Sequence, residues 1–266
     1  MYLSELIGAD QRLRHQPQLR ILDLCSGTGC ISLSLYSSLW KLFSAVEVLG
    51  VDVSDTAVSL ARRNVNHNVT LGHLPPEASR QISFVREDIL CEDWVPERHA
   101  RGSKAWDIVI SNPPYISKEG FNKDTARSVR TFEPQLALVP PSFPLEPGYK
   151  PSEPSALDDS SMYDVKLPDK LILSPEDIFY PRILSTAMAA RAKFVLMETA
   201  DLTQALRVSK YAHDMRCWSA VEIYRDWPDE TTESISQRWD NGMELKNVVV
   251  KGQGNGRSIL CRRQNV

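Results

Sequence analysis

One short segment near the N-terminus restricts the fold more than any other feature of the sequence. The apolar residues 20–24 stop at the turn residues 26–29, and apolar side chains then recur at helical spacing over residues 31–42. A buried strand, a glycine-containing loop and a helix in this order form the first unit of a doubly wound sheet. The glycine backbone and the free N–H groups of the helix start then face one point, which predicts a site for an anionic or nucleotide ligand.

Later segments continue the alternation of strands and helices. The further expected strands are residues 46–51, 82–85, 106–111, 193–198, 220–224 and 258–262, and the further expected helices are residues 56–66, 178–192 and 202–211. Either Ser54 or Asp55 is expected to cap the helix that starts at residue 56. Near-continuous apolar strands are typical of parallel sheets covered on both faces. The sequence therefore predicts an α/β, Rossmann-like doubly wound fold with a mostly parallel seven-stranded sheet and helices on both faces.

The segment from residue 134 to residue 181 interrupts this alternation. It contains more than half of the 17 prolines of the chain, with serines and acidic residues among them. A stretch of this composition buries too little apolar surface to offset its ordering entropy. We expect a disordered insertion at about residues 140–168 within one domain of residues 20–266, preceded by an N-terminal helix in residues 1–19. A linker between two domains is the alternative. We prefer the insertion because the later strands complete the sheet that the earlier ones begin.

Composition and charge exclude several classes of protein. The net charge is −3 and the arginines are scattered, which makes nucleic acid an improbable direct substrate. No apolar run approaches the roughly 20 residues that span a bilayer, so no membrane partner is expected. The five cysteines form no CxxC pair and the five histidines are dispersed, so we expect a reducing compartment and no metal site. No secretory signal or mitochondrial presequence is visible, and the compartment stays open between mitochondrion and cytoplasm.

Two acidic residues support the prediction of a nucleotide site at the glycine loop. Asp52 closes the second expected strand about 20 residues beyond the loop, where a carboxylate accepts the ribose hydroxyls. An ordinary turn or cap aspartate is the alternative. Asp88, after the third strand, is a candidate for the adenine amino group, and a turn role is almost as plausible for it. The predicted cofactor-binding residues are Asp23, Cys25, Gly27, Thr28, Gly29, Asp52, Asp88, Ile89 and Asn112. These features fit NAD as well as S-adenosylmethionine.

A second motif separates the two cofactors. The expected strand 106–111 ends at Asn112-Pro113-Pro114-Tyr115, which faces the glycine loop if the first and fourth strands are neighbours. The Asn112 side-chain oxygen and the Pro113 carbonyl can accept hydrogen bonds from the two N–H groups of an amide or ring-amino nitrogen. The prolines stiffen the turn, and Tyr115 offers a flat face for a planar substrate. These four residues are the predicted catalytic residues, and a simple proline turn is the alternative.

The sequence resembles the HemK-type peptide chain release factor glutamine methyltransferases from about residue 21 to residue 263. The resemblance is carried by the loop 23–29, Asp52, the Asn112–Tyr115 motif, the Phe-Glu-Pro-Gln-Leu-Ala-Leu segment 132–138, Glu198 followed by Gln204, and Gly256-Arg257-Ser258. It implies S-adenosylmethionine as cofactor. It also implies methyl transfer to the glutamine side chain in the Gly-Gly-Gln loop of a class I release factor.

The sequence departs from that family in three places. Cys25 stands where the family usually has the first loop glycine, and the proline-rich insertion is untypical of bacterial members. The N-terminal helical domain of the family and its Pro-x-x-Glu-Thr segment are not found in this sequence. Two alternatives therefore stay open: an adenine or cytosine amino methyltransferase acting on DNA or RNA, and an inactive, partner-binding protein with the same fold.

Overall fold

The computed structural model describes residues 2–91, 94–99, 106–141, 174–240, 242 and 244–263. The insertion expected at about residues 140–168 lies outside the described residues from residue 142 onward. The expectation of disorder there therefore stays a prediction.

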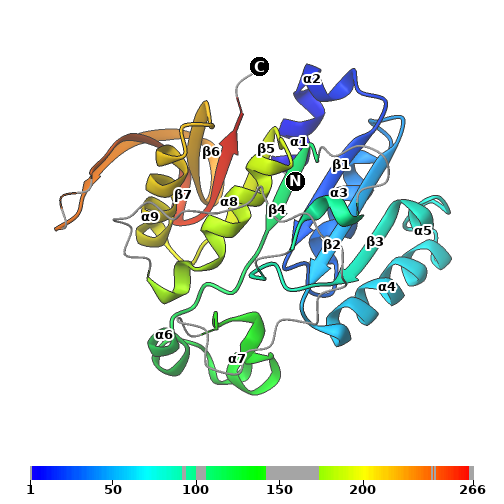
Figure 1. Ribbon diagram of the computed structural model, residues 1–266, viewed down its shortest axis with the longest axis horizontal. Helices are drawn as coiled ribbons and strands as arrows, with labels where there is room; N and C mark the ends of the chain where they lie inside the picture. Colours follow the sequence, from blue (N-terminus) through cyan, green and yellow to red (C-terminus); the bar gives the residue numbers. More distant parts are fainter. Residues whose placement is uncertain are drawn as a thin grey trace.

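A single seven-stranded sheet runs through the molecule in the order β3-β2-β1-β4-β5-β7-β6 (Figure 1). The strands are β1 (Leu19–Leu24), β2 (Val46–Asp52), β3 (Ile82–Arg86), β4 (Ile108–Ser111), β5 (Phe194–Glu198), β6 (Ala220–Arg238) and β7 (Glu244–Arg262). The first five are mutually parallel, and β7 is antiparallel to both β5 and β6. The predicted fold class is confirmed.

Helices cover both faces of this sheet. They are α1 (Tyr2–Ala9), α2 (Gln11–Arg14), α3 (Cys30–Leu39), α4 (Asp55–Thr70), α5 (Ala78–Gln81), α6 (Lys118–Lys123), α7 (Arg127–Phe132), α8 (Phe179–Ala189) and α9 (Leu202–Asp214), with short 3-10 turns at Pro96–His99, Gln135–Ala137 and Pro175–Asp177. Buried side chains of α1 to α5 form one core with strand residues such as Val48 and Ile108. Those of α8 and α9 form the second core, with strand residues such as Leu49 and Val109. Neighbouring strand residues thus point to opposite faces, as the pleat requires.

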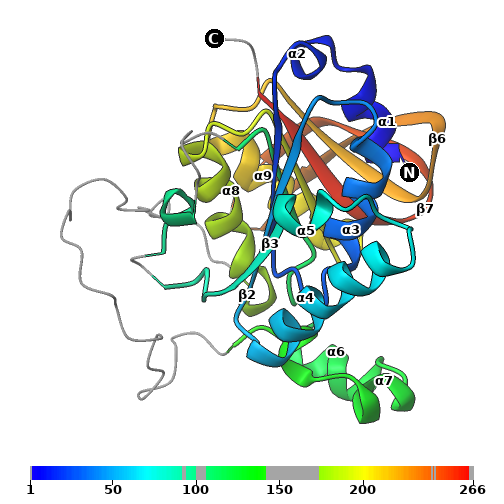
Figure 2. The ribbon, with the colours of Figure 1, turned by 90° about the vertical axis from the view of Figure 1, so that its right-hand side faces the viewer.

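The helices α6 and α7 stand apart from these two layers. Both views show them beyond the end of the sheet, below α4 and α8 (Figures 1 and 2). They were not expected from the sequence, because neither helix has a buried residue and so neither has an apolar stripe. Their position follows from the chain, which leaves β4 at Ser111 and reaches Ser117, the N-cap of α6, only six residues later.

The last two strands correct the sequence-based boundaries. Strands were expected over 220–224 and 258–262, yet β6 and β7 each have 19 residues and pair from Ala220↔Arg262 to Arg238↔Glu244. Much of the added length of β6 is exposed, so backbone hydrogen bonding supports it without an apolar face, and no apolar alternation marks it in the sequence.

Candidate functional site

The carboxyl ends of β1 and β4 lie side by side, which brings the two predicted motifs together. Leu24 pairs with Ser111, and the Ser111 hydroxyl donates to the Leu24 carbonyl at 2.8 Å. The glycine loop after β1 and the Asn-Pro-Pro-Tyr motif after β4 therefore begin from adjacent points on one edge of the sheet. This edge is where ligands bind in open α/β sheets, at the point where the winding reverses.

The glycine loop has an unusual backbone that explains its residue types. Cys25, Gly27 and Gly29 have φ of 59°, 54° and 81°, all in the left-handed region. A Cβ at Gly29 would also lie 2.6 Å from the ring of Phe84, so no larger residue fits there. Cys25 adopts a left-handed conformation although it is not glycine. This costs on the order of 1 kcal/mol more than it would cost glycine, which has no Cβ. Burial raises the pKa of its thiol, which therefore stays neutral.

Asp52 ties the loop to the end of β2. Its carboxylate accepts the Gly27 N–H at 2.7 Å and the Ser54 N–H at 2.9 Å. The Ser26 N–H adds a bond to the Val51 carbonyl at 3.0 Å. A carboxylate has about four acceptor positions, so Asp52 keeps capacity for further donors such as hydroxyl groups. The hydroxyl of Ser54 accepts from the Ala57 N–H and makes Ser54, rather than Asp55, the cap of α4.

Asp23 is a fully buried acid beneath the same loop. One of its oxygens accepts the Ser32 hydroxyl at 2.6 Å, and the other has no hydrogen-bond partner within the described residues. Burial raises the pKa of Asp23 from 3.8 to about 7, against the opposing effect of the Ser32 hydrogen bonds. The buried hydroxyl of Ser26 likewise lacks a partner among the described residues. These two polar atoms, with open space around Gly27, fit a ligand that carries amino and hydroxyl groups.

Asp88 and Ile89 follow β3 on the same edge of the sheet. Asp88 is buried, its carboxylate accepts the Leu90 N–H at 2.9 Å, and burial raises its pKa. Ile89 is buried in the core beneath α8. The guanidinium of Arg182 on α8 donates to the Ile89 carbonyl at 2.8 Å and to the Cys91 carbonyl at 2.6 Å. Arg182 thus holds the segment that carries Asp88. It was not expected from the sequence, because no motif marks a residue that acts from so far along the chain.

The Asn112–Tyr115 motif presents one side chain to solvent and buries the next two. Asn112 is exposed, whereas Pro113 and Pro114 are buried. Tyr115 is half-buried, and its hydroxyl donates to the Glu198 carboxylate at 2.8 Å. The motif therefore has a buried base and an Asn112 amide with no hydrogen-bond partner among the described residues, a combination suited to holding a small planar group.

The segment after the motif returns to it. The Ile116 N–H donates to the Leu138 carbonyl at 2.9 Å, so residues 117–137 form a projection that starts and ends beside the motif. Phe132 and Leu136 on this projection are 84% and 53% exposed. Apolar side chains this exposed, next to a candidate site, are typical of a contact surface for another macromolecule.

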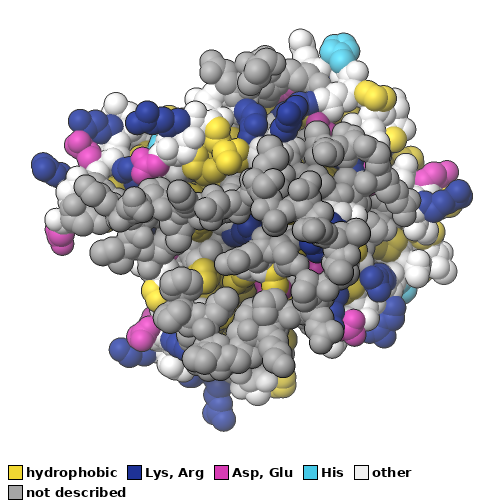
Figure 3. Space-filling model, viewed as in Figure 1, with side chains coloured by type: hydrophobic (Ala, Val, Ile, Leu, Met, Phe, Trp, Pro, Cys, Tyr) yellow, Lys and Arg dark blue, Asp and Glu magenta, His cyan; other side chains and the backbone are white. Residues whose placement is uncertain are grey.

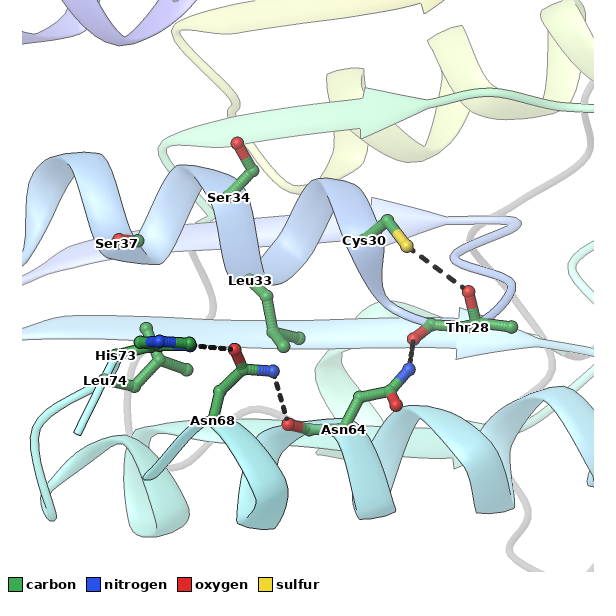
Figure 4. Close-up of a pocket in the computed structure, with 9 residues that line it drawn as sticks. All are labelled: Thr28, Cys30, Leu33, Ser34, Ser37, Asn64, Asn68, His73 and Leu74. Atoms are coloured by element: carbon green, nitrogen blue, oxygen red, sulfur yellow. Dashed lines mark hydrogen bonds between the residues drawn. The ribbon is translucent and has the colours of Figure 1, made fainter. Parts of the chain in front are cut away.

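A separate hollow of about 310 Å³ lies between α3 and α4 (Figure 4). The side chains around it come from both helices, from Thr28 and from the turn after α4, where His73 bonds to Asn68. Asn64 donates to the Thr28 carbonyl at 2.9 Å and so fixes the outer side of the glycine loop. The described residues that line the hollow do not include Asp52, Asp88 or Asn112, so we do not assign this hollow to the cofactor.

The described surface carries charges of both signs. On the face shown in Figure 3, the visible Lys and Arg side chains are dispersed among acidic and neutral side chains. Among the described residues, no three metal-ligating side chains gather, and no helix has the length and apolar character to cross a bilayer. All five cysteines are free thiols.

Comparison with known proteins identifies the fold. Residues 10–131 match the family model of the methyltransferase small domain. The catalytic domain of human Mettl16, solved with an RNA hairpin, superposes with a TM-score of 0.51 at 15% identity, covering 98% of this chain and 67% of that one. The chain thus has the class I methyltransferase fold, for which the cofactor is S-adenosylmethionine, and the predicted cofactor is confirmed.

Two curated relatives are similar over about half of the chain. A probable mitochondrial N(5)-glutamine methyltransferase of Schizosaccharomyces pombe, mtq1, named for MRF1, is 33% identical over 138 residues, which are 52% of this chain and 41% of that protein. A ribosomal protein uL3 glutamine methyltransferase of Francisella tularensis is 31% identical over 118 residues, 44% of this chain and 31% of that protein. The chain thus matches well under half the length of these relatives.

Proposed function

We propose that this class I methyltransferase domain transfers a methyl group to the side-chain amide nitrogen of a glutamine in a peptide chain release factor. The observation that carries the proposal is the pairing of Leu24 with Ser111, because it sets the Asn112–Tyr115 motif beside the cofactor loop. Asp52, Asp88 and the loop 23–29 are proposed to hold the cofactor. S-adenosylmethionine, when bound, supplies an electrophilic methyl group on a sulfonium centre.

The residues of the motif are proposed to prepare the acceptor nitrogen. An amide nitrogen is a weak nucleophile because its lone pair is delocalised into the carbonyl. The Asn112 oxygen and the Pro113 carbonyl would accept its two N–H groups and aim the lone pair at the methyl group. The rigid Pro113-Pro114 turn lowers the entropy of holding that geometry. The acceptor nitrogen ends with one proton fewer, and the exposed position of Asn112 lets that proton pass to water.

Three observations support a glutamine acceptor over a nucleobase. The relatives named above are both glutamine methyltransferases by name. The segment 132–138, which resembles the corresponding segment of the release factor methyltransferases, ends beside the motif, where Leu138 accepts the Ile116 N–H. The net charge of −3 offers little attraction to a polyanion. A ribosomal protein with an exposed glutamine is the second candidate acceptor, because one relative is named for uL3.

Radiolabelled methyl transfer to purified acceptors tests the proposal. The acceptors are a class I release factor, the same factor with asparagine in place of the Gly-Gly-Gln glutamine, ribosomal protein uL3, and an unstructured RNA. We expect label on the first alone, and label on uL3 or the RNA instead would replace the proposed acceptor. Calorimetry with S-adenosylmethionine, run in parallel, identifies an inactive partner-binding protein if neither binding nor transfer occurs.

Substitution of the motif tests the proposed role of Asn112. Asn112→Ala should lower the rate by about a hundredfold, the usual effect of losing one contact that is oriented for the transition state. Its affinity for S-adenosylmethionine should change little, because Asp52 and the loop are proposed to hold the cofactor. Asn66→Ala, an exposed asparagine on α4 away from the motif and the 117–137 projection, serves as the matched control and should keep the parent rate. A parent rate in Asn112→Ala would contradict the proposed role.

A further inference from the structure

A partly buried polar network stands behind the Asn-Pro-Pro-Tyr motif. It begins at Tyr115, whose hydroxyl donates to the Glu198 carboxylate at 2.8 Å. Glu198 is the last residue of β5, the strand next to β4, so the phenol of one strand end is fixed by the acid of its neighbour. Burial, with Glu198 as a further cause, raises the pKa of Tyr115, and the phenol therefore stays protonated and able to donate.

Glu198 is itself held in place from α8. The hydroxyl of Tyr180 donates to the backbone carbonyl of Glu198 at 2.9 Å. Arg257 lies close enough to act electrostatically on both Tyr115 and Glu198, and it donates to the Ala200 carbonyl at 2.6 Å. The acid thus has a fixed backbone and a positive neighbour, and its orientation is set before any substrate arrives.

Gln204, near the start of α9, joins the network to the backbone of the motif. Only 2% of this residue is exposed. Its amide oxygen accepts the Ala200 N–H at 2.8 Å and the Tyr180 hydroxyl at 3.3 Å. Its amide nitrogen donates to the Asp177 carboxylate at 2.9 Å and makes a longer contact, 3.4 Å, with the Tyr115 carbonyl. One side chain therefore contacts α8, the loop after β5 and the Asn-Pro-Pro-Tyr motif together.

An ion pair anchors the far end of this network. Asp177 is buried, and its carboxylate accepts from the Arg207 guanidinium at 2.7 Å and 3.0 Å. A bidentate pair of this kind fixes orientation as well as charge. Buried polar side chains are costly unless each finds its partners, so a network this well satisfied rigidifies what it touches.

We infer that Glu198 and Gln204 are positioning residues for the proposed methyl transfer, with Glu198 fixing the phenol of Tyr115 and Gln204 fixing its backbone. The inference rests on the proposed function, because it concerns the acceptor side of the same site. Tyr115 is proposed to give the planar acceptor group its flat wall. A phenol free to rotate would leave that group several orientations, and only one of them aims the nitrogen at the methyl group.

The kinetic test compares Glu198→Ala with Glu198→Gln, since an amide oxygen still accepts the Tyr115 hydroxyl. We expect Glu198→Ala to lower kcat/KM for the acceptor by about tenfold to a hundredfold, the factor for losing a hydrogen bond to a charged group. Glu198→Gln should recover most of the activity, and both should keep the parent affinity for S-adenosylmethionine within about twofold. Glu244→Ala, an exposed acid on β7, is the control for removal of a carboxylate. Parent kcat/KM in Glu198→Ala would overturn the inference, as would equal losses in both variants.

A double-mutant cycle isolates the contact. If Glu198 acts through the phenol, Glu198→Ala should cost little further activity in a Tyr115→Phe background. Additive losses would overturn the inference.

Gln204→Leu, of similar volume, should lower kcat more than it raises KM. Its melting temperature is measured first. Tyr180→Phe, which removes the hydroxyl that contacts both Gln204 and the Glu198 carbonyl, replaces it if the leucine variant does not fold.

A spectroscopic arm separates failure of the inference from failure of the proposed function. In protein labelled with 13C at the tyrosine ζ carbon, the Tyr115 signal is identified by its loss in Tyr115→Phe. We expect this signal to titrate well above pH 10 in the parent chain and closer to pH 10 in Glu198→Ala. If the parent chain methylates no acceptor, the proposed function fails, while this shift still supports the hold of Glu198 on the phenol. An unchanged titration overturns the inference whatever the activity.

Discussion

At the residue scale, we propose that Asp52 performs two tasks with one carboxylate. It binds the backbone N–H groups of Gly27 and Ser54, and it is the proposed acceptor for the ribose hydroxyls. The first task supports the second, because an acid already fixed by two N–H groups loses little freedom when a ligand binds. The alternatives weighed from the sequence, a turn role or a binding role, are therefore compatible in this geometry.

Removing this carboxylate should weaken cofactor binding. Asp52→Ala deletes the proposed hydroxyl acceptor and releases the loop, and we expect the affinity for S-adenosylmethionine to fall by about 1–3 kcal/mol. Asp55→Ala, three residues away and exposed on α4, is the matched control. Isothermal calorimetry measures both variants, and equal affinity in Asp52→Ala and the parent chain would refute the assignment.

Asp23 makes stability depend on pH in a predictable direction. Its pKa is about 7 in the folded protein and 3.8 when exposed, so between these values the folded state holds a proton that the unfolded chain releases. The stabilising effect of that proton is complete below pH 3.8 and is lost as pH rises toward 7. Above pH 7 the buried charge costs up to about 4 kcal/mol, at ~1.4 kcal/mol for each pKa unit.

The isosteric variant Asp23→Asn removes this dependence, because its amide never ionises. Its melting temperature relative to the parent chain should therefore rise from pH 5 to pH 8. Differential scanning calorimetry at several pH values checks this, with Asp55→Asn as the exposed control. A difference that stays constant with pH would show that Asp23 does not titrate in this range.

The residues that sequence reasoning located share a chemical constraint. The loop glycines, Asp52 and the Asn112 motif have proposed roles that few residue types can perform, so they stand out in one sequence. Arg182 and Tyr180 act through ordinary hydrogen bonds from α8, and many other residue pairs would serve equally. No local pattern marks such residues, and only the folded geometry identifies them.

At the element scale, the longer helices and strands with a buried face were found from the sequence, whereas the short helices α5, α6 and α7 were missed. The strands β1 to β5 and the helices α3, α4, α8 and α9 each carry a strong apolar pattern, so only their ends needed adjustment. The helices α6 and α7 bury no residue, so no periodic spacing of apolar residues predicts them from the sequence. Their exposure is instead a clue to their use, because they lie beside the motif.

The projection formed by residues 117–137 should contact the acceptor protein. Phe132→Ala removes an 84% exposed ring, and we expect KM for the acceptor to rise by about fivefold to thirtyfold, the effect of losing roughly 1–2 kcal/mol of apolar contact. The value of kcat and the melting temperature should stay near those of the parent chain. Leu42→Ala, 49% exposed in the turn that follows α3, is the control. An unchanged KM in Phe132→Ala would place the acceptor elsewhere.

At the scale of the whole molecule, one sheet connects two separate cores. The core beneath α1 to α5 and the core beneath α8 and α9 share the strands β1 to β7, whose alternate residues point into one or the other. The carboxyl edge of the same sheet carries the loop, Asp52, the Asn112 motif and Glu198. The site therefore depends on both cores, because residues from each face hold its parts.

This connection predicts that the domain unfolds in one transition. Leu39→Ala empties part of the core under α3, and Leu184→Ala does the same under α8 on the opposite face; both leucines are fully buried. Each should cost about 2–5 kcal/mol and lower the same single calorimetric transition, because the shared strands cannot keep one core without the other. Leu71→Ala, 54% exposed after α4, should change stability by less than about 0.5 kcal/mol. Saturating S-adenosylmethionine should raise the free energy of unfolding of all three variants, by about 2.7 kcal/mol at a hundred times Kd, and should keep the transition single. Two transitions, with each variant lowering only its own, would show that the faces fold independently.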